Sequence, residues 1–276
     1  MLREVAAPAG AGFVLSPAAF EAIREVLYSS SGITLSPAKH GLVQARLAKR
    51  LRELGLDSFD AYVARLGNDP SEVPRMVDAM TTNKTSFFRE AAHFEFLLER
   101  TLPVWRRTEH RVRVWSAGCS SGEEPYSLAM LLAESLSAQR QREALILATD
   151  ISERVLARAR MGEYGDGALA EVEPRRRERF FEATASGGRV RPEVQEMVRF
   201  ARLNLLEAWP MRGPFDAIFC RNVMIYFDES TRTRLAQRFR ALLPPGGLLL
   251  IGHSESLGPS PVGLRCLRPS IYARDP

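Results

Sequence analysis

Features that indicate a disulfide scaffold, a metal site or a membrane protein are scarce in this chain. Its three cysteines are far apart and include no C-x-x-C pair, which argues against a disulfide framework or a zinc cluster. The four histidines, His93 and His253 among them, show no metal-ligand spacing, so we expect no metal. No apolar run approaches the roughly 20 residues that cross a bilayer, and the N-terminus lacks a signal-peptide pattern. We therefore expect a cytoplasmic protein with no direct membrane insertion.

The composition fits a globular chain with one large core and a small accessory domain. The 276 residues are 45% hydrophobic, which is enough to bury such a core. A net charge of +5 would permit an acidic protein surface, nucleic acid or anionic lipid as partner. Charge alone does not choose among them.

The chain is organised around residues 112–130, where an apolar run ends in a glycine-bearing loop that leads into an amphipathic segment. A second apolar run, residues 144–148, is followed by Thr149 and Asp150. This strand, helix, strand order predicts a doubly wound parallel sheet, in which ligands bind beyond the carboxyl ends of the strands and an acid takes a ribose hydroxyl pair. Gly118, Gly122 and Asp150 fit that geometry. The spacing is not G-x-G-x-x-G, so the loop alone is a weak signal.

Two carboxylates follow this loop in the first turn of the predicted helix. Glu123 and Glu124 would repel a pyrophosphate at a helix N-terminus. They suit instead a nucleoside ligand with positive charge, and S-adenosylmethionine is the common one. The alternative is that both residues complement the helix dipole, which we favour more for Glu124 than for Glu123.

The N-terminal part, residues 13–82, is predicted to be a compact helical domain. Ser16-Pro17 and Ser36-Pro37 each pair a serine cap with proline at the first helical position. Gly32 and Gly55 are predicted helix stops. The second helix carries a basic ridge that is either a solvated face or a docking surface for an acidic partner helix. The ridge comprises Lys39, Arg46, Lys49, Arg50 and Arg52.

The rest of the chain, residues 83–276, is predicted to form the domain that contains this sheet. Residues 185–200 predict a small β-hairpin subdomain because Gly187-Gly188 is followed by an alternation around Val190, Val194 and Val198. Asn204 and Asn222 follow apolar runs, where a carboxamide suits an adenine edge or an amino-acid backbone, although such asparagines usually serve turns. Strands are expected at residues 248–251 and near 265–273.

Four motifs, taken in order, resemble the CheR family of chemoreceptor glutamate methyltransferases. They are Thr82-Asn83-Lys84-Thr85-Ser86-Phe87-Phe88-Arg89, Gly122-Glu123-Glu124-Pro125-Tyr126-Ser127, the run from Phe215 through Cys220-Arg221-Asn222 to Phe227, and Gly252-His253-Ser254-Glu255. The resemblance implies an N-terminal all-α receptor-recognition domain, followed along the chain by a methyltransferase domain with a Rossmann-like sheet. It also implies S-adenosylmethionine bound at Asn83, Thr85, Arg89, Glu123, Asp150, Asn204, Leu205, Arg221 and Asn222.

The resemblance further implies what the protein acts on. Arg89 and Tyr226 match positions proposed to orient cofactor and substrate, and the basic ridge matches the helix that meets the receptor. The expected product is a glutamyl methyl ester on cytoplasmic helices of a chemoreceptor. The segment from Ser186 to Arg191 is shorter than the hairpin that grips a receptor tail in some members, which argues against tail docking. We expect a monomer.

Two other functions compete with this one. An RNA methyltransferase would fit the positive charge, but it needs an aromatic stacking surface, and the aromatics here fall on predicted core positions, so we expect no nucleic-acid partner. A non-enzymatic adaptor that senses the cofactor would not require all four motifs. Transfer to a carboxylate needs no Ser-His-Asp set, because glutamate is already ionised at neutral pH.

Overall fold

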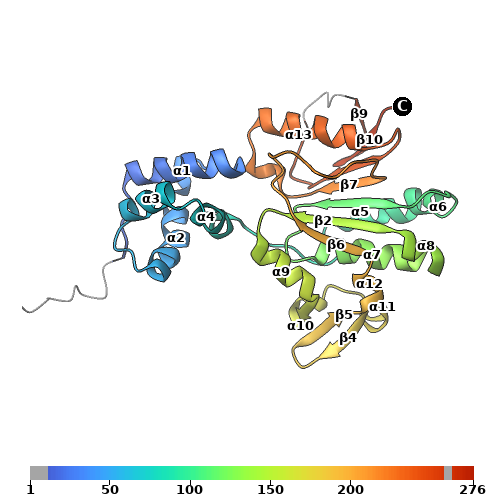
Figure 1. Ribbon diagram of the computed structural model, residues 1–276. Coiled ribbons are helices and arrows are strands. Elements are labelled where there is room, and N and C mark those ends of the chain that lie inside the picture. The colour runs from blue at the N-terminus through green and yellow to red at the C-terminus, as the bar shows by residue number, and fades with distance from the viewer. Residues whose placement is uncertain (1–11, 258–262) are drawn as a thin grey trace, which may run out of the picture. The chain divides into compact units, whose positions relative to one another are not determined.

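The computed structural model describes residues 12–257 and 263–276, and the chain divides into two compact units. The first ends at Thr81 and the second begins at Thr82 (Figure 1). Among the described residues, no helix combines the length and the apolar character that crossing a bilayer requires.

The first unit is helical. It consists of α1 (Pro17–Ser31), the 3-10 turn η1 (Pro37–Lys39), α2 (His40–Leu54), α3 (Phe59–Asn68) and α4 (Glu72–Met80). The predicted cap of α1 is confirmed, since the Ser16 hydroxyl accepts the N–H of Ala19 at 3.1 Å. Gly32 and Gly55 end α1 and α2 with φ of 71° and 66°, as predicted. Ser36 and Pro37 stand at the predicted N-cap and first helical positions, but of the 3-10 turn η1 that precedes α2, and the Ser36 side chain makes no capping bond there.

A buried carboxylate joins three helices of this unit. Glu72, fully buried on α4, accepts two hydrogen bonds from Arg50 of α2 at 2.7 and 2.6 Å and one from the Tyr62 hydroxyl of α3 at 3.1 Å. The paired geometry supplies the charge compensation that a buried carboxylate needs.

The second unit is built on a seven-stranded sheet with strand order β6-β2-β1-β7-β8-β10-β9. The first five strands are parallel, and β10 pairs antiparallel with β8 and β9. The bounds are β1 (Arg113–Ala117), β2 (Leu145–Asp150), β6 (Val198–Arg202), β7 (Ala217–Cys220), β8 (Leu248–Ile251), β9 (Leu264–Arg268) and β10 (Ile271–Arg274). The predicted doubly wound sheet is confirmed. The single late strand expected near 265–273 is two strands.

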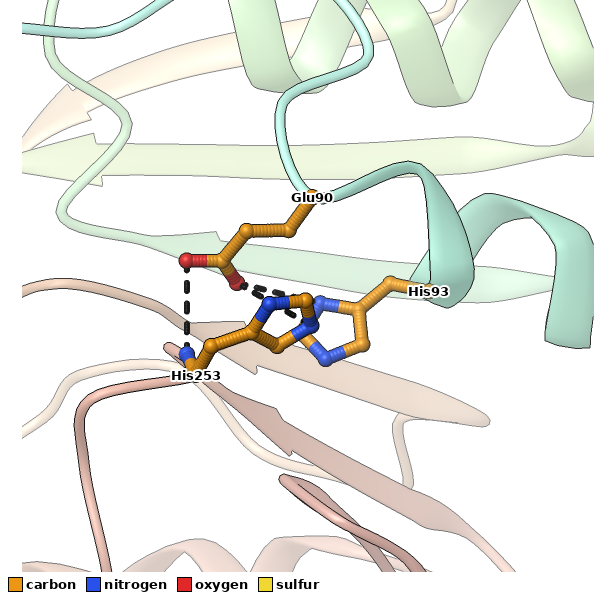
Figure 2. Close-up of side chains that lie close together, drawn as sticks. All are labelled: Glu90, His93 and His253. Atoms are coloured by element: carbon orange, nitrogen blue, oxygen red, sulfur yellow. Dashed lines mark hydrogen bonds and ion pairs between the residues drawn. The ribbon is translucent and has the colours of Figure 1, made fainter.

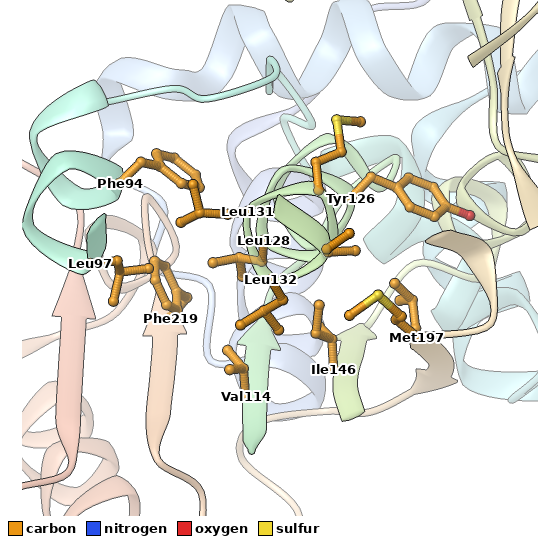
Figure 3. Close-up of a cluster of buried hydrophobic side chains, with 14 of the residues drawn as sticks. Phe94, Leu97, Val114, Tyr126, Leu128, Leu131, Leu132, Ile146, Met197 and Phe219 are labelled. Carbon is orange, nitrogen blue, oxygen red and sulfur yellow. The ribbon is translucent and has the colours of Figure 1, made fainter. Parts of the chain in front are cut away.

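Side chains alternate between the two faces of the sheet, and helices cover both. On one face, Val114, Ile146 and Phe219 pack beneath α7 (Glu123–Ser135) and α5 (Ala91–Phe96), as Figure 3 shows. The neighbouring residues Trp115 and Ile218 face the opposite core, which includes α13 (Glu229–Leu242). Burial on both faces explains why these strands read as continuous apolar runs.

Short elements complete this unit between the main helices and strands. They are η2 (Leu97–Thr101), α6 (Leu102–Trp105), α8 (Ala138–Glu143), α9 (Glu153–Met161), α10 (Asp166–Leu169), α11 (Pro174–Phe180), α12 (Pro192–Gln195) and the 3-10 turn η3 (Met224–Tyr226).

A separate three-stranded antiparallel sheet has the order β3-β5-β4, with β3 (Glu163–Gly165), β4 (Phe181–Thr184) and β5 (Gly187–Val190). The antiparallel subdomain was expected, but the range 185–200 is wrong. The hairpin starts at Phe181, α12 follows it, and β6 belongs to the main sheet. Phe87 packs between Tyr164 and Phe181 with ring centroids 4.8 and 5.6 Å away, and so attaches the small sheet to the segment before α5.

An aromatic cluster lies under α13. Trp115 and Trp209 meet edge to face with ring centroids 4.8 Å apart, and Trp209 stacks on Phe239 at 5.1 Å. The Arg238 guanidinium lies 3.7 Å from the centroid of the Trp209 ring, which keeps that charge over an aromatic face.

Candidate active site

The order of the strands decides where a ligand binds. The chain runs from β1 outward to β2 and β6, and then returns to β7 on the other side of β1. In such sheets the crevice lies at the carboxyl ends of the two strands where the direction reverses. The loops after β1 and β7 therefore border the candidate site, and the loops after β2 and β8 flank them.

Asp150 closes the loop that follows β1. Its carboxylate accepts the backbone N–H of Ser120 and of Ser152, both at 2.9 Å, and the residue is buried. Gly118 and Gly122 in this loop have φ of 88° and 99°, a region that disfavours side chains. A Cβ atom on Gly118 would lie 2.3 Å from Val223, so the loops after β1 and β7 approach closely only because this residue is glycine. The predicted arrangement of loop and acid is present.

Glu123 is buried in the first turn of α7. The Ser121 hydroxyl contacts both of its carboxylate oxygens, at 3.0 and 2.8 Å, and the Ser121 carbonyl accepts the Tyr164 hydroxyl at 2.7 Å. Burial raises the pKa of Glu123 above its ordinary value, although the hydrogen bond from Ser121 opposes this shift. The site thus holds a desolvated carboxylate beside the glycine loop.

Glu124 does more than complement the helix dipole. It accepts the Ser116 hydroxyl at 2.7 Å and pairs with Arg221 at 3.3 Å, and its side chain is only 13% exposed. Burial raises its pKa, with Arg221 and Ser116 opposing the shift. The residue therefore neutralises a buried arginine at the tip of β7.

Arg221 connects several parts of the site. Besides Glu124 it contacts Glu90 at 3.2 Å and donates to the carbonyl oxygen of Arg89. Burial acts to raise the pKa of Glu90, but the charge of Arg221 and the amide of Asn222 outweigh it and hold that pKa below its usual value. One guanidinium thus ties α7, the tip of β7 and the segment before α5 together.

Glu255 fixes the loops after β7 and β8. Its buried carboxylate accepts the backbone N–H groups of Asn222 at 2.9 Å, Gly252 at 2.5 Å and Ile225 at 3.1 Å. The Asn222 amide donates to Glu90 at 3.2 Å. The two loops are therefore held by hydrogen bonds to charged groups, which are stronger than neutral ones.

The segment before α5 reaches the site through its backbone. The Ser120 hydroxyl donates to the Asn83 carbonyl at 3.1 Å, and the Tyr226 hydroxyl donates to the Thr82 carbonyl at 3.4 Å. Arg89 donates to the Lys84 carbonyl at 2.8 Å, so its guanidinium folds over its own segment, which also carries Thr85. The structure thus brings Asn83 to the glycine loop, and Arg89 and Tyr226 to the backbone of the residues on either side of Asn83.

Asn204 and Leu205 follow β6. The Asn204 side chain accepts the N–H of Leu206 and donates to Glu207, both at 3.1 Å, which is the turn chemistry that asparagine commonly supplies. Leu205 is buried. Both residues lie at the carboxyl end of a strand of the same sheet as Asp150.

The sequence patterns did not reveal the roles of Glu90 and Glu255. Both residues stand inside recognisable motifs, but their partners are far away in the chain, so no local spacing indicates them. Backbone strain is a second sign of the site: Phe88, Glu90, Ser120 and Asn222 all have positive φ. Such strained backbone conformations persist where the surrounding structure holds them in place, and they cluster at active sites.

A Rossmann-like sheet with an acid at the tip of β2 fits a ligand that contains a nucleoside, and buried carboxylates after the glycine loop favour a cationic one, as expected of a methyltransferase domain that uses S-adenosylmethionine. The comparisons with known proteins agree. Residues 83–270 match the family described as CheR methyltransferase, SAM binding domain, and residues 18–81 match its all-alpha domain. The chain belongs to the CheR methyltransferase family.

Curated relatives match over nearly their whole length. Chemotaxis protein methyltransferase 2 of Pseudomonas aeruginosa is 43% identical over 260 residues, which cover 92% of each chain. The chemotaxis protein methyltransferase of Escherichia coli is 43% identical over 249 residues, 88% of this chain and 85% of that protein. The protein is accordingly an S-adenosylmethionine-dependent methyltransferase of chemotaxis.

Proposed function

We propose that the protein transfers the methyl group of S-adenosylmethionine to glutamate side chains on the cytoplasmic helices of chemoreceptors, forming glutamyl methyl esters. The observation that carries this proposal is the convergence of Asp150, Arg221 and the segment before α5 around the glycine loop. The family membership supports the chemotaxis context. Such receptors place the reaction in the cytoplasm.

The cofactor residues of the proposal surround this loop. Asp150 is held by two backbone N–H groups at the tip of β2, the position from which an acid reaches ribose hydroxyls. The remaining residues proposed to bind the cofactor are Asn83, Thr85, Arg89, Glu123, Asn204, Leu205, Arg221 and Asn222. A sulfonium and an ammonium are both cations, so the buried Glu123 carboxylate favours them over a phosphate-bearing ligand.

The chemistry needs positioning more than proton transfer. A glutamate side chain has a reference pKa of about 4.3, so the substrate is already a nucleophile at neutral pH and needs no general base. The cofactor supplies an electrophilic methyl group. Holding the reacting atoms in line contributes as much as roughly 7 to 11 kcal/mol to lowering such a barrier. We assign this orienting role to Arg89 and Tyr226, which both approach the segment around Thr82 and Lys84.

The helical unit is proposed to recognise the receptor through the basic face of α2. Lys39, Lys49 and Arg52 are exposed, whereas Arg50 pairs with Glu72 and Arg46 donates to the Met80 carbonyl. The proposed surface of Lys39, Arg46, Lys49 and Arg50 therefore presents its two lysines most openly. A set of exposed cations suits the acidic helices that carry methylatable glutamates.

The test is methyl transfer from labelled cofactor to receptor fragments. The product should release labelled methanol in alkali, because carboxyl methyl esters hydrolyse there. Label that survives alkali would indicate methylation of nitrogen or carbon and would refute the proposal. Fragments with the labelled glutamates changed to alanine serve as the substrate control.

The cofactor assignment has its own test. Asp150→Ala should abolish binding of S-adenosylhomocysteine in calorimetry. Asp166→Ala is the matched control, because Asp166 is an exposed acid that pairs only at the surface with Arg177. Near-normal affinity in Asp150→Ala would remove Asp150 from the site.

A further inference from the structure

Three side chains beside the proposed active site form a compact group of nitrogen and oxygen donors. They are Glu90, just before α5, His93 on α5 and His253, in the loop after β8 (Figure 2). One ligand atom from each lies within 4.8 Å of the others. The two histidines are far apart in the sequence, which is why their spacing did not indicate a metal.

The hydrogen bonds around Ser270 favour one tautomer of His93. Its Nε2 lies 2.7 Å from the Ser270 hydroxyl oxygen, and that hydroxyl donates its single proton to the Pro269 carbonyl at 2.6 Å. We assign the ring proton to Nε2, which then donates to Ser270. The other ring nitrogen, Nδ1, is left as an unprotonated lone pair.

This lone pair is buried and has no donor. His93 is fully buried, its Nδ1 has no hydrogen-bond partner, and Oε2 of Glu90 lies 3.5 Å from this nitrogen. Two acceptors that face each other in a buried place repel unless a cation lies between them. A second lone-pair donor is close, since His253 Nε2 lies 3.9 Å from the same Oε2.

The spacing of these atoms fits a first-row transition metal. Ligand bonds of about 2.1 Å at a tetrahedral centre place two ligand atoms roughly 3.4 Å apart. The 3.5 Å separation of His93 and Glu90 meets this value, and the 3.9 Å separation of His253 requires a small rotation of a half-exposed side chain.

The two carboxylate oxygens of Glu90 have different partners. Oε1 accepts the Asn222 amide at 3.2 Å and the backbone N–H of His253 at 3.3 Å, so the carboxylate is already oriented with Oε2 toward the histidines. Arg221 also contacts Oε2, at 3.2 Å, but its charge is shared with Glu124. The cluster of one arginine and two carboxylates therefore keeps a net negative charge for a cation.

We propose that Glu90, His93 and His253 bind one divalent transition metal ion, with Zn²⁺ preferred. Two imidazoles and a carboxylate form a ligand set that zinc accepts, and hard cations such as Mg²⁺ select oxygen ligands instead. Glu90 also contacts Arg221 and Asn222, two of the residues proposed to bind the cofactor. The metal would therefore lie beside the cofactor site, but these two residues would not be its ligands.

Zinc binding to the untagged, metal-stripped protein tests this proposal by calorimetry. We expect one Zn²⁺ per chain, and a visible tetrahedral spectrum when Co²⁺ replaces it. His253→Ala should weaken zinc binding roughly tenfold or more, since even outer-shell changes cost that much. His110→Ala is the control, because His110 pairs with Asp216 at 2.7 Å, away from the three ligands.

His93→Ala is a second variant, with circular dichroism of the metal-free protein to verify its fold. Because His253 is half exposed, its variant keeps the test decisive if the buried His93→Ala does not fold. Absence of zinc binding at micromolar concentration, or equal affinity in wild type and His253→Ala, overturns the proposal. None of these measurements depends on methyl transfer.

Discussion

Removal of the Arg221 guanidinium should destabilise the second unit strongly. In Arg221→Met, Glu90 and Glu124 lose their common counter-charge while both side chains stay 13% exposed. Breaking a buried ion pair by deleting one partner costs about 3–5 kcal/mol, and the lost donation to the Arg89 carbonyl adds about 1 kcal/mol. Against a typical stability of about 5–15 kcal/mol, the variant should fold but unfold at much lower urea.

The pH dependence gives this prediction a direction. Without Arg221, the folded-state pKa of Glu90 is no longer held down by that charge, and the already raised pKa of Glu124 rises further. Groups with a raised folded pKa bind protons on folding, so the variant gains stability as the pH falls through the folded pKa toward the unfolded pKa. The loss relative to wild type should therefore be larger at about pH 7.5 than at about pH 5.5.

Urea denaturation followed by circular dichroism at both pH values measures these losses. Arg189→Met is the matched control, because Arg189 pairs with Glu163 on the exposed small sheet and should contribute little. A loss in Arg221→Met as small as in the control, or a loss that grows on acidification, would refute the assignment of Arg221 as the shared counter-charge.

Three further predictions concern separate parts of the chain. Glu72→Gln should cost the helical unit about 3 kcal/mol in urea, because the arginine it pairs with keeps its charge without a counter-charge; an unchanged midpoint would contradict the pairing. Gly118→Ala should cost about 2–4 kcal/mol, since a Cβ meets Val223 at 2.3 Å with φ at 88°, whereas Gly167→Ala, with open space around it, should not destabilise. In the native protein a thiol reagent should modify Cys266, which is exposed, and reach the two buried cysteines only after denaturation, because burial raises the pKa of both thiols. Rapid modification of all three in the folded state would show that those cores open.

The parts of the fold set by local patterns could be predicted from the sequence. The strand, loop and helix around Gly118, the acid at the tip of β2 and the cap of α1 each depend on neighbours within a few residues. Such signals survive in a single sequence because propensity and capping act locally. The hairpin shows their limit: the predicted range 185–200 includes Gly187 but leaves out β4, and it assigns the start of β6 to the subdomain instead of the main sheet.

The ion pairs and hydrogen bonds of the site could not be predicted in this way. Arg221 with Glu124, Glu255 with Asn222, and His93 beside His253 are pairs that only the sheet topology brings together. Their residues were visible inside motifs, but a motif does not state which carboxylate faces which cation. Glu124 illustrates this point, since a first-turn acid is ordinarily explained by the helix dipole alone.

The aromatic cluster under α13 has a practical consequence for spectroscopy. All three tryptophans, Trp105, Trp115 and Trp209, belong to the second unit, and the first 81 residues contain none. Indole emission therefore reports only on the sheet domain, and melting of the helical domain is silent at those wavelengths. A single tryptophan introduced on an exposed face of α3 would let the two transitions be followed independently in one intact chain.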